Sequence, residues 1–483
     1  MPLLKVLIPF AIGIAVADRV ALPAWFVAAV LLIGGAAALL THRSRWLVLL
    51  LAAAGYGATL VRPAPAAPPV GRRTVFEIRL TEAPDMRGNA EGVVTAWRDP
   101  AAKRWHATRV RLRLHTNPQE GLRLEAGDRL LCHTVLRPFT GGSESFRRLM
   151  HRRGFVGSCY LTERSLVEHL PALRRGLHRR ASERLEERIG TPRDSLRRDA
   201  AAVVRAMAVG DRRGLHPALR DAYARSGMAH LLAVSGLHTG IVYLLVAALF
   251  AWLPLRHGGH RLRNLLVIAG LWLYVAAAGA APGAVRAAVM CSILQLGLAT
   301  SSPYRAMNAW AAAALLMLLW RPAWLYDISF RLSFVAVAAI LLWGVPLARR
   351  LRTGRWYADL VTQPLAIGLA ASLATAPLVS HAFGIVPLAG ILLNPVVVLS
   401  GALVTGGGVL LLLLPPLQGV LRPATMQVAA WQNRLAERVA ACDAGVLETG
   451  LSAEAVALLY LGFVAATLAA WSFERKKSVH LPA

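Results

Sequence analysis

The chain has 483 residues, 56% of them hydrophobic, and a formal net charge of +28. Several apolar runs are long enough to cross a bilayer, which predicts a polytopic α-helical membrane protein. The four cysteines include no pair at zinc-ligand spacing, and no Walker A loop, HEXXH sequence, H-x-H-x-D-H cluster or kinase signature occurs. The sequence therefore excludes those nucleotide and metal sites, and we expect no metal, no cofactor and no enzyme activity in it.

The positive charge has two sources. Cytoplasmic loops of membrane proteins carry excess Lys and Arg, which explains part of it. The rest lies in a polar segment of about 150 residues, too large for a simple loop. A basic region of this kind favours an anionic partner, either nucleic acid or lipid headgroups, and the alternative is an ordinary solvated surface.

Residues 1–61 contain three apolar runs, at 3–17, 24–40 and 46–61, which predict N-terminal transmembrane helices. The cationic cluster at 42–45 lies between the second and third runs, and the positive-inside rule places it in the cytoplasm. The chain then emerges outside the membrane after the third run. We interpret the first run as an anchor and not as a signal peptide, because further apolar runs follow it.

Residues 62–165 predict an extracytoplasmic β domain. The Pro-rich stretch RPAPAAPPV at Arg62–Val70 marks a boundary, and beyond it apolar residues alternate with polar ones as in half-buried strands. Five short strands separated by turn signals favour a small β-barrel of the OB type. The expected strands are Thr74–Thr81, Ala90–Trp97, Trp105–His115, Arg129–Leu136 and Phe155–Leu161.

The third of these strands predicts a basic face. Val110, Leu112 and Leu114 would point into the barrel, and Arg109, Arg111 and Arg113 would point out of it. OB barrels bind single strands with a basic groove and aromatic stacking platforms. The candidate platforms are Trp97, Trp105, Phe139 and Phe155, although core packing is the more common use of such residues and the one we favour.

Cys132 and Cys159 both fall on expected strands. They are a candidate disulfide if this domain faces an oxidising compartment.

From Leu166 to Gly227 the pattern is helical with one charged side, which predicts amphipathic or juxtamembrane helices over 166–227. A multi-span domain over 228–413, an amphipathic segment over 414–452 and a last transmembrane helix with a cationic tail over 453–483 follow. If 384–413 crosses the membrane once, the cationic tail at the end of the chain would lie outside, against the positive-inside rule. A broken half-helix at Gly390 and Asn394-Pro395 would resolve this conflict. The expected spans are 231–253, 264–280, 284–300, 306–320, 329–347, 361–380, 396–413 and 453–472.

The stretch AHLLAVSGLHTGIV at Ala229–Val242 carries the densest polar signal. His230, Ser235 and His238 stand at the mouth of an apolar run, and polar groups there often line a cavity or pathway. A close helix–helix contact explains the small residues equally well. We rank an intramembrane serine hydrolase third, because the glycine of a nucleophile elbow does not precede Ser235.

Few other polar groups lie within the apolar runs. Arg286 pairs with Asp327 in one interpretation, while Arg331 pairs with Asp327 at i, i+4 in a purely local one. Asn394 precedes a proline. These residues would line a path for an anionic passenger, or would form structural ion pairs and caps at the membrane edge.

Several motifs together resemble the ComEC-type competence proteins, the inner-membrane DNA-uptake channels of transformable bacteria. They are HLLAVSGLHTG (230–240), GAAPGAVRAAVM (279–290), DISFRLSFVAV (327–337), ATAPLVSHAFGIVPLAGILLNPVVV (374–398) and GGSESFRRLMHRRGFVGS (141–158), in the family's order. Ser329 and Arg331 stand where members of the family often have Gly and Gln. The printed sequence also stops at Ala483 without the metallo-β-lactamase-like domain of many members.

The resemblance implies a channel that admits single-stranded DNA, with the OB domain outside the bacterial inner membrane. It implies that His230, Ser235, His238 and Arg286 belong to the conduction region. It further implies other competence proteins as partners, namely a DNA receptor, a cytoplasmic motor and a separate nuclease, and it is compatible with a homo-oligomer. The alternatives from the residues alone are a transporter of another anionic solute or lipid-linked species, and the serine hydrolase.

Overall fold

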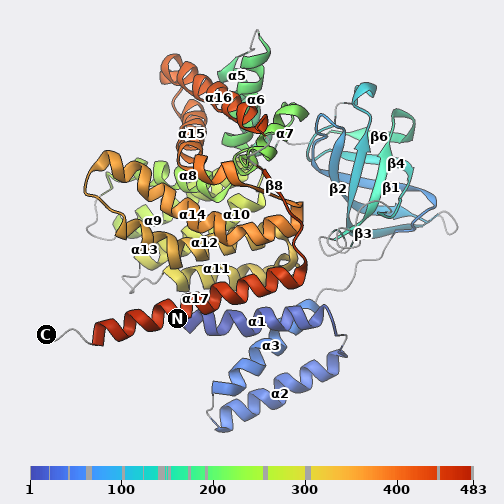
Figure 1. Ribbon diagram of the computed structural model, residues 1–483. Coiled ribbons are helices and arrows are strands. Elements are labelled where there is room, and N and C mark those ends of the chain that lie inside the picture. Colours follow the sequence, from blue (N-terminus) through green and yellow to red (C-terminus); the bar gives the residue numbers. More distant parts are fainter. Residues whose placement is uncertain are drawn as a thin grey trace.

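The computed structural model describes residues 2–20, 22–41, 44–60, 68–99, 104–122, 124–139, 147, 150, 154–171, 176–190, 194–253, 259–299, 306–442 and 446–479. They form a larger body of helices and a separate β-sheet region beside it (Figure 1). In the sequence, the strands of the sheet lie between α3 and α5. The helices before and after this insertion belong to one body (Figure 1).

The three expected N-terminal helices are confirmed as α1 (Pro2–Ala17), α2 (Ala24–Thr41) and α3 (Ser44–Leu60). The hydroxyl of Tyr56 donates to Val20 O at 2.8 Å and accepts from Leu22 N at 2.5 Å, which ties α3 to the α1–α2 turn. On α1, Phe10 and Ile14 are buried in one cluster with residues of α11 (Ala306–Trp320) and α12 (Ile328–Ala339).

The sheet has six strands in the order β5-β3-β2-β1-β4-β6, with β3 and β5 parallel and the other neighbours antiparallel. The five expected strands are confirmed. The ladders do not close into a barrel, although one isolated bridge joins Arg137 to Ser158 beyond the end of β4. The strands are β1 (Arg73–Glu82), β2 (Asn89–Arg98), β3 (Trp105–Thr116), β4 (Arg129–Val135), β5 (Phe155–Leu161) and β6 (Leu166–Leu170).

The expected helix is wrong for Leu166–Leu170, because this segment forms a sixth strand. This segment pairs along the free edge of β4, with Leu170 opposite Arg129 and Glu168 opposite Leu131. The strand therefore depends on a partner about 40 residues away along the chain, and hydrogen bonds at a sheet edge override the local helical pattern.

The expected inward face of β3 is confirmed, since Val110, Leu112 and Leu114 are at most 1% exposed. Cys132 on β4 and Cys159 on β5 lie in the same core, and the structure holds both as free thiols. Burial raises the pKa of Cys132 to about 12 and raises the pKa of Cys159 as well. The Cys132–Cys159 disulfide remains a prediction for an oxidising compartment.

The helical body is built around α6, whose residues from Ala200 to Val209 are largely buried against α15 and α16. A short antiparallel two-stranded sheet of β7 (Ile385–Pro387) and β8 (Val446–Glu448) joins two distant parts of it. Its helices are α5 (Leu177–Ile189), α6 (Ser195–Val209), α7 (Pro217–Arg225), α8 (Gly236–Leu249), α9 (Gly259–Ala277), α10 (Pro282–Ala299), α11, α12, α13 (Val345–Arg350), α14 (Trp356–Phe383), α15 (Leu388–Leu413), α16 (Gln418–Ala440) and α17 (Ala453–Val479). A π-helical turn, Ile340–Gly344, joins α12 to α13, and single 3₁₀ turns occur at Pro118–Glu120, Glu163–Ser165, Ala229–Leu231, Pro322–Tyr326 and Pro415–Leu417.

The expected broken half-helix near Asn394-Pro395 is wrong, because α15 runs without interruption from Leu388 to Leu413. The proline removes one backbone donor, which a helix tolerates when neighbouring groups satisfy the freed carbonyl. The side chain of Asn394 lies against Gly368 of α14, where there is no Cβ to exclude it.

Among the described residues, three helices are long and apolar enough to cross a membrane by length and composition. They are Ile328–Arg350, Trp356–Phe383 and Val396–Leu413. Most of the other expected spans form apolar helices of 10–17 residues. The expected number of crossings and the outside position of the sheet remain predictions.

Candidate functional site

The outer face of β3 carries the three predicted arginines. Arg111 is paired with Glu91 of β2, and its guanidinium lies 4.4 Å from the centre of the Phe155 ring. Arg109 is exposed and Arg113 is half-buried, and neither forms an ion pair with an acidic residue in the described part of the chain. Two of the three arginines are therefore available to an anion in solution.

Aromatic rings lie on and around this face. Trp97 stacks on His106 with ring centres 4.5 Å apart, and the His115 ring lies 5.1 Å from that of Tyr160. The Tyr160 side chain is 56% exposed, and Arg137 lies 5.6 Å from its ring centre. Tyr160 was not predicted from the sequence, although the alternation of β5 places it on the outer face by burying Phe155, Gly157, Cys159 and Leu161.

The four predicted stacking platforms are in different surroundings. Trp105 is 49% exposed at the start of β3, whereas Phe155 is 1% exposed and belongs to the core. Trp97 is half-buried and packs partly on the sheet core. Phe139 is half-buried beyond β4. Trp105 and the unpredicted Tyr160 are thus the rings most open to a base.

A row of charged side chains leads from this face toward the helices. Arg111 contacts Glu91, which is paired in register with Glu82 at the end of β1. Burial raises the pKa of Glu82, and the neighbouring Glu91 raises it further, while the charges of Arg212 and Arg111 act in the opposite direction. Arg212 in turn donates from Nε to the Leu232 carbonyl at 3.0 Å.

Arg212 belongs to the loop between α6 and α7, which is fixed by a buried carboxylate. Arg213 donates to both oxygens of Asp211 at 2.9 Å, and Ser182 of α5 donates to the same carboxylate at 2.5 Å. Burial alone would raise the pKa of Asp211, but the hydrogen bond and charge of Arg213 and the Ser182 hydroxyl hold it well below its ordinary value. The loop is therefore rigidly positioned beside the sheet.

We call residues Gly227–Ser235, between α7 and α8, the central loop. Gly227 has φ +78°, and a Cβ there would lie 3.2 Å from Gly390 Cα and 2.9 Å from Pro387 Cβ. A Cβ on Gly283, in the first turn of α10, would lie 2.7 Å from Val234 O. Only glycine fits these contacts, so the starts of α10 and α15 both press directly on the central loop.

Ser235 and His238 meet at the start of α8. The Ser235 backbone N–H donates to His238 Nδ1 at 3.3 Å, so the neutral ring carries its proton on Nε2. Ser235 and His238 thus form a capping box, in which the Ser235 side chain also accepts from the His238 backbone N–H. His238 is 0% exposed, and within the described residues its Nε2 has no hydrogen-bond partner, so this nitrogen is the polar atom of the pair that is left unsatisfied.

His230 belongs to the same central loop. It is exposed on the 3₁₀ turn Ala229–Leu231, and its Nδ1 is 3.1 Å from the Gly227 carbonyl.

Arg286 in α10 contacts the start of α12. It is 6% exposed, and its Nη2 donates to Ser329 Oγ at 2.8 Å. Asp327 caps α12 by accepting from the N–H groups of Ser329 at 2.8 Å and Phe330 at 3.3 Å. Arg331 donates from Nε to the Leu325 carbonyl at 2.7 Å.

Three helix N-termini meet in this region. The first turn of α10 lies against Val234 and Ser235, which precede α8, and Arg286 connects α10 to the first turn of α12. Each helix N-terminus carries about half a positive charge. The carboxylate of Asp327 already occupies the N-terminus of α12, so the guanidinium of Arg286 and the N-termini of α8 and α10 are the positive groups that favour a further anion.

Comparison with known proteins gives a consistent result. A family model described as "Competence protein" matches residues 207–474. The chain is 36% identical over 145 residues to "ComE operon protein 3" of Bacillus subtilis (strain 168), which covers 30% of this chain and 18% of that protein. It is 32% identical over 210 residues to "Competence protein ComA" of Neisseria gonorrhoeae, covering 41% of this chain and 28% of that protein.

A third relative is an "Uncharacterized protein" of Aquifex aeolicus (strain VF5), 30% identical over 186 residues, or 38% of this chain and 41% of that one. The matches thus cover less than half the length of each of these relatives. No solved structure matches the chain. The family match includes α8, α10 and α12 but not the sheet.

Proposed function

Because the chain belongs to the competence protein family, we propose that it serves DNA uptake as an inner-membrane channel that passes a single strand into the cytoplasm. The observation that carries the proposal is the meeting of three helix N-termini around the buried Arg286. A phosphate backbone is the polyanion that such a site favours. His238 Nε2 and Ser235 Oγ would offer further polar contacts along the same path.

We propose that the sheet is an OB-like domain on the outer side of the membrane and the first contact for the strand. Its β1-β2-β3 meander, with β5 parallel to β3 and β4 antiparallel to β1, supports this proposal, as does the bridge between Arg137 and Ser158. Phosphates would meet Arg109 and Arg113, and bases would stack on Tyr160.

A transporter of another anionic solute is the second candidate, because helix N-termini and one arginine attract any anion. Binding of a labelled single-stranded oligonucleotide to the full-length protein in detergent discriminates the two. The channel requires binding that weakens steeply with salt, whereas a solute transporter requires none. A serine hydrolase has less support, because His238 Nδ1 accepts from the Ser235 backbone N–H and the Ser235 hydroxyl caps α8, so the pair is arranged as a helix cap and not as a base and nucleophile.

The experiment that tests the proposal is transformation of a strain that lacks this gene and carries wild type, Arg286→Ala or the control Arg349→Ala. Arg349 is an exposed arginine at the end of α13. We expect the deletion to abolish transformants while DNA still gathers outside the inner membrane. Arg286→Ala should lower transformants about 100-fold at normal protein level, as for a loss of about 3 kcal/mol of interaction, and Arg349→Ala should leave them unchanged. Normal transformation by the deletion strain would disprove the channel.

A further inference from the structure

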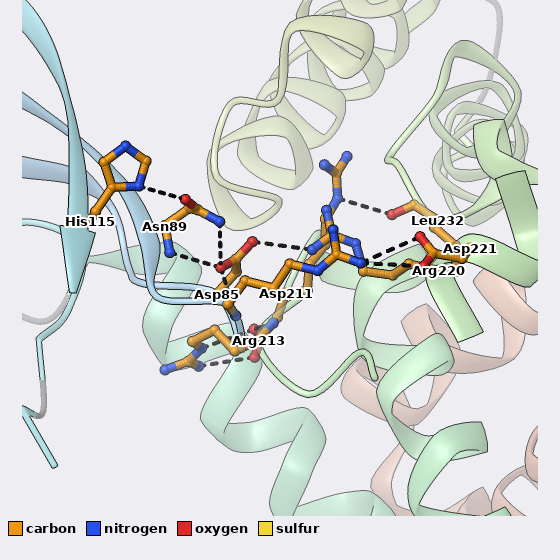
Figure 2. Close-up of polar contacts among 10 residues, drawn as sticks. Asp85, Asn89, His115, Asp211, Arg213, Arg220, Asp221 and Leu232 are labelled. Carbon is orange, nitrogen blue, oxygen red and sulfur yellow. Dashed lines mark hydrogen bonds and ion pairs between the residues drawn. The ribbon is translucent and has the colours of Figure 1, made fainter. Parts of the chain in front are cut away.

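A line of polar contacts joins the outer face of β3 to α7 (Figure 2). The His115 ring packs on Tyr160, and its Nδ1 lies 2.9 Å from Asn89 Oδ1. The backbone and side-chain nitrogens of Asn89 donate to Asp85 Oδ1 at 2.9 and 3.4 Å. Asp85 Oδ2 then accepts from Arg220 Nη1 at 3.2 Å. Four side chains thus connect the sheet face to a helix more than 100 residues away along the chain.

The chemistry of these groups fixes which atom donates and which accepts in each hydrogen bond of the line. A carbonyl oxygen only accepts, so the contact with Asn89 requires the proton of His115 to be on Nδ1. The two oxygens of Asp85 have separate roles, because Oδ1 holds the β1–β2 turn while Oδ2 holds the helix. Asp85 is therefore one point at which the sheet is joined to the helical body.

The helix at the other end leads directly into the central loop. Arg220 lies in α7, which ends at Arg225, only two residues before Gly227. Tyr223 anchors α7 in the body through a buried 2.8 Å hydrogen bond to Asn433 Oδ1. The loop that precedes α7 is bonded to the central loop as well, through Arg212 and the Leu232 carbonyl.

A second ion pair crosses the same boundary, and Arg87 of this pair touches the line only through its backbone N–H, which donates to Asp85 Oδ1 at 3.0 Å. Arg87 and Asp221 are 3.3 Å apart, and their side chains are 53% and 67% exposed. The Asp85–Arg220 pair is less exposed, at 24% and 37%. The more exposed pair provides a matched control, because it links the same two elements and contacts neither His115 nor Asn89.

We propose that Asp85 is a positioning residue that couples the β3 face to α7 and the central loop, so that a strand stacked on His115 and Tyr160 restrains the central loop. This inference rests on the proposed function, because it takes the β3 face as the nucleic-acid face. Coupling of this kind requires contiguous groups that ligand binding biases together, and the line from Tyr160 to Arg220 supplies them.

The test is hydrogen exchange of peptides covering residues 217–238 in the full-length protein in lipid nanodiscs, with and without an oligothymidine strand. In wild type we expect the strand to slow exchange about two- to fivefold. Asp85→Asn keeps an acceptor for the β1–β2 turn but loses the charge that holds Arg220. It should bind the strand within about twofold of wild type, yet lose most of the slowing. Asp221→Asn should behave as wild type.

Equal slowing in Asp85→Asn and wild type would overturn the coupling. If wild type binds no oligothymidine, the proposed nucleic-acid face fails instead, and the network is then judged in the unliganded protein. There, exchange in α7 that is about two- to fivefold faster in Asp85→Asn than in Asp221→Asn would support the positioning role. Equal rates in the two variants would reject it.

Discussion

Polar side chains have opposite surroundings in the sheet and in the helical body. On the sheet, Arg109 is exposed and the acids at the edge are paired with arginines of the helices, so water and counter-charges compensate most of the charge. In the body, Arg286 and His238 are at most 6% exposed, and each has a nitrogen without a partner among the described residues. Substitutions on the sheet should therefore have graded, salt-dependent effects, whereas substitutions in the body should have large ones.

The largest effect is expected at Gly227. Alanine there meets both a positive φ and the Cβ contacts with Gly390 and Pro387, which should lower the free energy of unfolding by about 2–5 kcal/mol. Gly384→Ala is the control, because Gly384 has φ +73° but open space around it. It should cost only about 1 kcal/mol. Thermal unfolding in detergent measures both, and equal losses would show that packing on the central loop adds nothing.

Asp211 should produce the next largest effect, with a pH signature. Its pKa is depressed in the folded protein, so its stabilisation is present above about pH 4 and is lost as the pH falls further. Asp211→Asn should lower the free energy of unfolding by about 1–3 kcal/mol at pH 7 and flatten this acid limb. Unfolding temperatures of wild type and Asp211→Asn, measured from pH 3 to pH 7, test this prediction. An unchanged acid limb in the variant would assign that limb to other carboxylates.

On the sheet, the Tyr160 ring should contribute a moderate effect. Tyr160→Ala should weaken binding of an oligothymidine strand to the full-length protein about tenfold, the cost of one stacked base. Tyr160→Phe keeps the ring and should bind within about twofold of wild type. Fluorescence anisotropy measures both, and equal weakening by the two variants would indicate a role for the hydroxyl and not for stacking.

The smallest effect should be a change of salt dependence. Removing Arg109 and Arg113 together should reduce the slope of log affinity against log salt by about 0.7 per arginine. Arg129→Ala is the control, because Arg129 is paired with Glu77 on β1. Its slope should match wild type. An unchanged slope in the double variant would move the phosphate contacts away from β3.

The sequence predicted the parts of the fold that depend on local pattern. Alternation placed Val110, Leu112 and Leu114 in the sheet core, and apolar runs located the membrane-type helices. It failed at Leu166–Leu170, because that strand exists only through pairing with β4. It also failed at Asn394-Pro395, where helix packing overrides a signal that usually breaks a helix.

The candidate site was predicted only in its residue types. The sequence marked Arg286, Ser235 and His238 as candidates. It did not predict the contact between Arg286 and Ser329, because these two residues are 43 positions apart in the sequence. It suggested Arg286 or Arg331 as the partner of Asp327, which in the structure also caps α12 through two backbone N–H groups. The line from His115 to Arg220 had no sequence signal, because it joins a strand, a turn and a helix that only the tertiary fold brings together.

The meeting of the N-termini of α8, α10 and α12 has a practical consequence. Part of its attraction for anions comes from the backbone amides of α8 and α10, which do not titrate and which no side-chain substitution removes. Alanine scanning will therefore underestimate the contribution of this region to anion binding. The contribution of the amides should persist from acidic to alkaline pH. Backbone ester substitution in the first turn of α10, by semisynthesis, would remove the amide donors that side-chain chemistry leaves in place.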